Sequence, residues 1–123
     1  MANEISVSAS LAATNGTLIV PTFGGTQQID QATAGGGGPG FLKIGTSWET
    51  IALTDITTPG VCWCKNLDAT NYVELGTNDG GGDQEFLKLK AGEYFPFRLS
   101  GLTTLRARAN SAEVKILLIV LED

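Results

Sequence analysis

The chain has 123 residues, enough for one domain, and its 42% hydrophobic and 17% charged residues are typical of a globular protein. Its net charge of −5 argues against a duplex DNA-binding protein, which needs a basic surface to displace counterions. The sequence contains no histidine, which removes the commonest general base and metal ligand. The N-terminal residues do not resemble a secretory signal, and no apolar run is long enough to span a membrane. We therefore expect one soluble domain, 1–123, made in a reducing cytoplasm.

The N-terminal part of the chain has the pattern of a β-hairpin. Apolar and polar residues alternate over 4–12, which is typical of a half-buried strand. The dipeptide Asn15-Gly16 follows, and it favours a tight turn because both residues tolerate a positive φ. We expect a return strand over 17–20 and a further short strand within 26–33.

Two glycine-rich segments interrupt the alternation. The first, AGGGGPG at 34–40, predicts a flexible loop without regular structure. It contains the spacing GxGxxG, but the residues after it indicate a strand and not the helix that a dinucleotide site requires. The second, TNDGGGDQ at 77–84, predicts a loop between two strands.

The rest of the chain reads as short strands separated by turns. We expect them over 41–45, 49–54, 61–67, 72–76, 85–90, 93–99, 103–109 and 113–121. Pro96 lies inside one of them, which indicates an edge strand or a bulge because proline cannot donate to the sheet. The total is about nine to eleven strands and no helix, which predicts an all-β protein, an antiparallel β-sandwich of jelly-roll-like type.

The last predicted strand is apolar on both faces. Ile116, Leu118 and Val120 form one alternating set, and the residues between them are also apolar. Such a strand is either central in a closed sandwich or covered by another subunit. We therefore include these three residues in a candidate protein interface.

Both cysteines lie in the segment VCWCKNLDATNYVELG, 61–76. Cys62 and Cys64 are two residues apart, so in a strand their side chains point to the same face. Two thiolates cannot complete a tetrahedral zinc site within a chain that has no histidine. We predict two small buried side chains and no metal site.

The same segment predicts a hairpin around the turn Asp68–Asn71, because aspartate and asparagine side chains stabilise turns through backbone N–H groups. This register would place Lys65 opposite Glu74. It would also place Trp63 and Tyr72 together on an outer face, which we interpret as a surface that a partner covers.

Two clusters of charge leave alternatives open. Arg106 and Arg108 share one face of a strand and would either pair with carboxylates of the same sheet or form a docking patch for an acidic partner. Asp79, Asp83 and Glu85 could hold calcium through oxygen ligands, although their spacing does not match the EF-hand pattern. We expect no catalytic residues, no metal and no cofactor.

Four stretches, KNLDATNYVELG, IGTSWETIAL, FLKLKAGEYFPFRL and ANSAEVKILLIVLED, resemble small all-β virion structural proteins of tailed bacteriophages. The resemblance covers 41–123 well and the N-terminal strands loosely. It implies a sandwich or jelly roll on the particle, most like a capsid decoration (cement) protein that is often a trimer.

From this resemblance we expect a non-enzymatic homo-oligomer that is synthesised in the host cytoplasm and located on the capsid surface of the virion. Its partner would be the major capsid protein, with no nucleic acid and no membrane involved. The alternative is a recognition module of the tail, collar or a fibre that binds a host glycan or protein through exposed aromatic residues.

Overall fold

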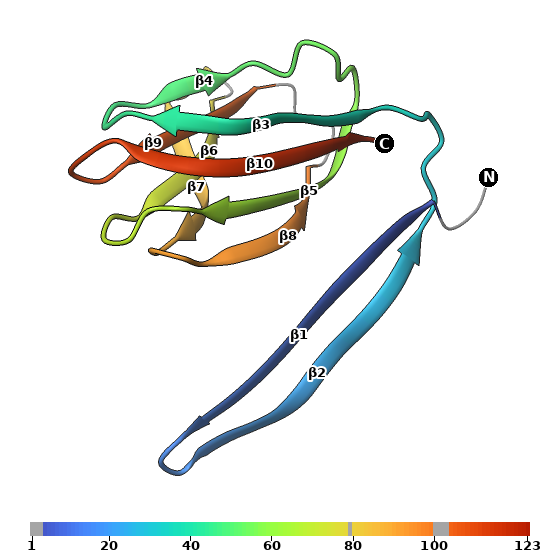
Figure 1. The fold of residues 1–123 in the computed structure, drawn as a ribbon, viewed down its shortest axis with the longest axis vertical. Coiled ribbons are helices and arrows are strands. Elements are labelled where there is room, and N and C mark those ends of the chain that lie inside the picture. Colours follow the sequence, from blue (N-terminus) through green and yellow to red (C-terminus); the bar gives the residue numbers. More distant parts are fainter. Residues whose placement is uncertain (1–3, 79, 100–103) are drawn as a thin grey trace. The chain divides into compact units, whose positions relative to one another are not determined.

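The computed structural model describes residues 4–78, 80–99 and 104–123, which form two compact units (Figure 1). The first lies within Met1–Ala32 and the second within Thr33–Asp123. The described residues contain ten strands, and no helix among them is long and apolar enough to cross a membrane. The predicted all-β class is confirmed. The two four-stranded sheets of the sandwich lie within the second unit.

The first unit is an antiparallel hairpin of β1 (Ile5–Asn15) and β2 (Leu18–Ile29). The predicted hairpin and its turn are confirmed, with Gly16 at a φ of 60° beside the last paired residue of β1. The return strand is longer than predicted, because it continues past Pro21. This proline lies where the register shifts, a position in which the missing N–H does not interrupt the pairing.

The second unit consists of two four-stranded antiparallel sheets that pack face to face as a β-sandwich (Figure 1). Sheet I contains, in spatial order, β3 (Gly36–Ile44), β10 (Val114–Glu122), β5 (Pro59–Asn66) and β8 (Tyr94–Arg98). Sheet II contains β4 (Glu49–Ile51), β9 (Leu105–Ala109), β6 (Val73–Asn78) and β7 (Asp83–Leu89).

The core lies between the two sheets and follows the alternation of their strands. Completely buried side chains of sheet I include Cys64, Ile116, Leu118 and Val120, and those of sheet II include Val73, Leu75, Leu89 and Leu105. Burying one such aliphatic side chain contributes about 2 kcal/mol to stability. The core therefore fixes which residues of each strand remain available to a partner.

The tract AGGGGPG is not the predicted flexible loop, because Gly36–Gly40 belongs to β3. Gly38 pairs with Val120 and Gly40 with Leu118, so the neighbouring strand supplies the order that the local composition disfavours. At Gly36 the φ is 91°, and an added Cβ would lie 2.6 Å from the carbonyl oxygen of Val120. Glycine is needed there because the two backbones approach each other so closely.

The segment 61–76 does not form the predicted hairpin. β5 pairs with β10 and β8 in sheet I, whereas β6 pairs with β7 and β9 in sheet II. The connection between them therefore crosses from one sheet to the other. Glu74 lies opposite Lys88 and Arg108 instead of Lys65, which lies opposite Leu117 and Tyr94. The alternation of apolar and polar residues predicted which side chains point to the core, but it could not predict which strands lie next to each other.

The expectation for Pro96 is confirmed. β8 is an edge strand of sheet I, and Pro96 lies opposite Trp63 of its only neighbouring strand in the described sheet. A proline is tolerated at this position because an edge strand has one side on which no ladder hydrogen bond is required.

Candidate functional site

The side of sheet I that points away from the core carries two cross-strand rows of side chains. The first row is Phe41, Leu117, Lys65 and Tyr94, and the second is Pro39, Ile119, Trp63 and Pro96. We call these eight residues the outer face of sheet I. Phe41 is 65% exposed and Tyr94 57%, while Trp63, Leu117 and Ile119 are half-buried. A mainly apolar surface that extends across four strands is typical of a protein-interaction site.

The aromatic and basic side chains of this surface contact one another. The rings of Trp63 and Tyr94 are 5.8 Å apart at an interplanar angle of 38°, and the Lys65 Nζ lies 5.5 Å from the Tyr94 ring. The Lys115 Nζ lies 5.4 Å from the Phe41 ring, next to the cross-strand pair of Lys115 and Lys43.

Neither row contains an acidic residue, and the lysines lie in and beside the row of Phe41. The surface is thus apolar with basic charge along one side. This combination fits a partner whose contact surface is apolar and bears carboxylates.

The opposite side of the sandwich is charged, and its two arginines pair with carboxylates of the same sheet. The Arg106 Nε donates to the Asp83 Oδ1 at 2.7 Å, and the Arg108 Nε donates to the Glu74 Oε1 at 2.9 Å. The hydrogen bonds with Arg106 hold the pKa of Asp83 below its usual value, and Asp83 raises the pKa of Arg106. Of the two alternatives for these arginines, the structure shows pairing with carboxylates of the same sheet.

Tyr72 does not share a surface with Trp63, contrary to the prediction. Trp63 lies on sheet I, whereas Tyr72 precedes β6 of sheet II, where the Lys88 Nζ lies 4.0 Å from its ring. The prediction placed them together because it paired β5 with β6. Trp63 instead has Ile119 and Pro96 as its cross-strand neighbours.

The final strand contributes its other alternating set to the surface. Ile116, Leu118 and Val120 are completely buried in the core of the chain itself, so they cannot contact a partner as predicted. Leu117 and Ile119 point outward and are half-buried. Both sets are apolar, and only the position of β10 between β3 and β5 shows which set faces outward.

The thiols lie in the core, as expected. Cys62 is 2% exposed and Cys64 0%, and both are free. Burial raises the pKa of each thiol to about 12. Among the described residues, no group of three or more potential ligands of the His, Cys, Asp or Glu type could hold a metal ion.

The carboxylates considered for calcium do not form a common site in the part that the structure describes. Asp79 lies outside the described residues. Asp83 is bonded to Arg106, and Glu85 is exposed on β7 opposite Gly76.

The corner between the two sheets contains a buried polar residue that the sequence did not reveal. Asn66 is 0% exposed, and its Nδ2 donates to the carbonyl oxygens of Asn71, at 2.9 Å, and Leu89, at 3.0 Å. Its Oδ1 accepts from the Asp68 N–H at 2.8 Å. Asp68 in turn accepts from the N–H groups of Asn71 and Thr70, which lowers its pKa. The predicted hydrogen bonds from backbone N–H groups to the Asp68 side chain are present, but the turn they stabilise connects a strand of sheet I with a strand of sheet II.

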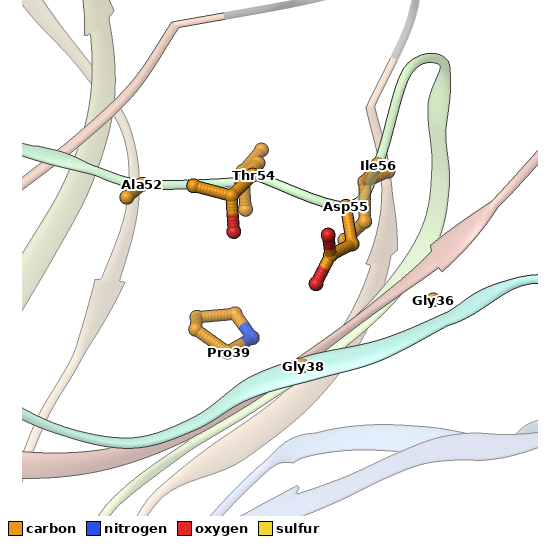
Figure 2. Close-up of a pocket in the computed structure, with 8 residues that line it drawn as sticks. Gly36, Gly38, Pro39, Ala52, Thr54, Asp55 and Ile56 are labelled. Atoms are coloured by element: carbon orange, nitrogen blue, oxygen red, sulfur yellow. The ribbon is translucent and has the colours of Figure 1, made fainter.

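A small pocket lies between β3 and the segment 52–56 (Figure 2). Figure 2 shows the Thr54 hydroxyl and the Asp55 carboxylate turned toward the side of Pro39. The volume of the pocket is about 130 Å³. Sites for drug-sized ligands are usually about 300–1,000 Å³, so this pocket suits a few water molecules better than an organic ligand. The outer face of sheet I is therefore the stronger candidate for function.

Comparison with protein-family models, curated proteins and solved structures gives no match for this chain. What bears on function is therefore the chemistry of this surface, together with the resemblance in the sequence.

Proposed function

We propose that this protein is a structural component of a tailed bacteriophage particle, a capsid decoration protein that docks on the major capsid protein. The observation that carries the proposal is the outer face of sheet I, which is apolar, four strands wide and basic on one side. The two arginines on the other sheet are already paired with carboxylates of the chain itself. One side of the sandwich is thus suited to a partner, and the other to solvent.

The proposed action is physical and involves no catalysis. Covering Trp63, Ile119 and Phe41 with a partner removes apolar surface from water, and the lysines favour a partner surface that carries carboxylates. A protein that binds the assembled shell more tightly than the dissociated capsid subunits stabilises the shell by mass action. The chain would act as a homo-oligomer, which we expect to be a trimer.

The proposal is tested by co-sedimentation of the purified protein with shells of the major capsid protein. Ile119→Glu places a carboxylate in the centre of the outer face, and Gln84→Glu places the same charge on an exposed position of sheet II. We expect wild type and Gln84→Glu to bind alike and Ile119→Glu to bind at least about tenfold more weakly, because it buries an unpaired charge. Equal binding of all three would contradict the proposal.

The pair of Trp63 and Tyr94 favours a second candidate, a recognition module of the tail, collar or a fibre. Two adjacent aromatic rings on an open surface can stack against the apolar face of a sugar. A glycan array compares wild type with Trp63→Ala. Selective glycan binding that Trp63→Ala abolishes would favour this candidate over capsid docking, and absence of binding would count against it.

A further inference from the structure

We infer that the β1–β2 hairpin joins copies of this chain around a symmetry axis through one apolar face. This inference rests on the self-association in the proposed function and assigns it to a segment. The cross-strand pairs Leu11–Phe23, Ala13–Val20 and Asn15–Leu18 lie on one side of the hairpin. We call Leu11, Ala13, Leu18, Val20 and Phe23 the hairpin apolar face.

The hairpin has a polar side as well. Ser6, Ser8 and Ser10 alternate with the apolar residues of β1, and the Ser8 hydroxyl is hydrogen-bonded to the Thr26 hydroxyl at 2.8 Å. The Gln28 amide donates to the Ser6 hydroxyl at 3.5 Å. This side also carries Ile19, which is 71% exposed opposite Thr14. Because its other side chains are mainly polar, the side of Leu11 and Phe23 is the one that needs a partner.

The hairpin apolar face is open to solvent. Leu11 is 65% exposed, Phe23 61% and Leu18 55%, and the strands are 11 and 12 residues long. A two-stranded hairpin is marginally stable at best in water unless its apolar face is covered. The length of the two strands and their alternation of apolar and polar residues indicate that a partner covers the hairpin apolar face.

The charge distribution identifies what covers it. The chain has 8 basic and 13 acidic residues, and all 21 lie outside residues 5–29. Near the axis of a symmetric oligomer each residue lies close to its own copies, so any charged residue there meets a like charge. A charge-free segment in a chain of net charge −5 is therefore suited to meet identical segments.

The outer face of sheet I, in contrast, is charged. Lys65 within it, and Lys43 and Lys115 beside it, would each lie near their own copies if this surface surrounded a symmetry axis. That arrangement is unfavourable, whereas a different partner with acidic groups is favourable. The two open apolar surfaces therefore have different partners: the hairpin meets other copies of the hairpin, and sheet I meets the capsid.

The test measures the mass of the full-length protein in solution by light scattering after size exclusion. Phe23→Glu places a charge on the hairpin apolar face, and Ser10→Glu places the same charge on the polar side. We expect wild type and Ser10→Glu to have the mass of an oligomer, a trimer for the symmetry favoured here, and Phe23→Glu to have the 12.9 kDa of one chain. A monomeric wild type, or an oligomeric Phe23→Glu, would overturn the inference.

A crosslinking experiment covers the case in which Phe23→Glu disorders the hairpin. Leu11→Cys and Ser10→Cys are compared in a background in which Cys62 and Cys64 are replaced by alanine. Under mild oxidation Leu11→Cys should give disulfide-linked chains, because copies of residue 11 lie near the axis, and Ser10→Cys should remain uncrosslinked. No crosslink with Leu11→Cys, or equal crosslinking of both, would overturn the inference.

The failure of this inference and the failure of capsid docking are distinguishable. Ile119→Glu should lose binding to the shell and keep the mass of the oligomer, since it leaves the hairpin unchanged. If Ile119→Glu still binds the shell while Phe23→Glu is monomeric, docking through sheet I is refuted and the inference about the hairpin is supported. If Phe23→Glu remains oligomeric while Ile119→Glu loses binding to the shell, the inference about the hairpin is refuted and docking through sheet I is supported.

Discussion

Asn66 holds the corner where the chain leaves sheet I for sheet II. Its side chain bonds three backbone groups, those of Asp68, Asn71 and Leu89, and it is completely buried. A buried backbone group that loses its partner costs free energy, because water cannot replace the lost bond. Asn66 therefore stabilises the fold because it provides hydrogen-bond partners for these three backbone groups.

Asn66→Ala should lower the free energy of unfolding by about 3 kcal/mol, about 1 kcal/mol for each lost hydrogen bond. The exposed Ser111→Ala, which removes a hydrogen bond to Asn71 and one from Asn110, should change it by less than about 0.5 kcal/mol. Urea denaturation measures both values. Equal stability of Asn66→Ala and wild type would show that the corner is held by other contacts.

The two cysteines should be inert in the folded protein. Their pKa values of about 12 leave almost no thiolate at neutral pH, and both side chains are buried. A thiol reagent at about pH 8 should modify neither cysteine before unfolding and both afterwards. Rapid modification of either thiol in the native protein would contradict their assignment to the core.

At the scale of elements, strand positions could largely be predicted, but their partners could not. Alternation indicated most strands, and Pro96 correctly indicated an edge. Alternation also placed Cys64 in the core and Trp63 on the opposite face. It could not show that β5 and β6 belong to different sheets, since the turn chemistry at Asp68 fits a hairpin and a crossing equally well.

The pairing of distant strands explains what the sequence could not show about the candidate site. Phe41, Ile119 and Trp63 come together only because β10 lies between β3 and β5. The same pairing orders the glycine tract that composition alone assigns to a loop. Local sequence patterns therefore predicted which side of each strand points to the core. Contacts between residues distant in the sequence determined which strands are neighbours and so which outward side chains form one surface.

The carboxylates of Asp68 and Asp83 make stability depend on pH. Hydrogen bonds from backbone N–H groups lower the pKa of Asp68, and those from Arg106 lower the pKa of Asp83. A lowered folded-state pKa means that the stabilisation is fully present above the unfolded value, about 3.9, and is lost as the pH falls through the folded value.

Urea denaturation at about pH 7 and at pH values below about 4 should therefore show lower stability in acid. Asp83→Asn removes one of the two carboxylates, so its stability should fall less with pH than that of wild type. An identical pH dependence in both proteins would show that the pair of Asp83 and Arg106 does not contribute.

Across the whole molecule, charge is distributed unevenly. Residues 5–29 have no charge, the outer face of sheet I has only positive charge, and the two arginines of sheet II are paired with carboxylates. Under the two proposals, the hairpin meets identical copies and sheet I meets a different partner. The two associations should respond differently to salt.

Binding to the shell should weaken as the salt concentration rises from about 0.05 to 0.5 M, because ions screen the lysines from acidic groups of the partner. The mass of the oligomer should not fall over the same range, since apolar contacts hold it. Co-sedimentation and light scattering at each concentration measure the two responses. Dissociation of the oligomer by salt would contradict an uncharged contact.

Under the proposed function, this protein covers a phage capsid. Quantitative mass spectrometry of purified phage particles that contain the protein tests the proposal most directly, because it measures the ratio of the protein to the major capsid protein. A decoration protein should be present in a copy number comparable to that of the major capsid protein. A copy number of only a few per particle, or its absence from particles, would contradict the account.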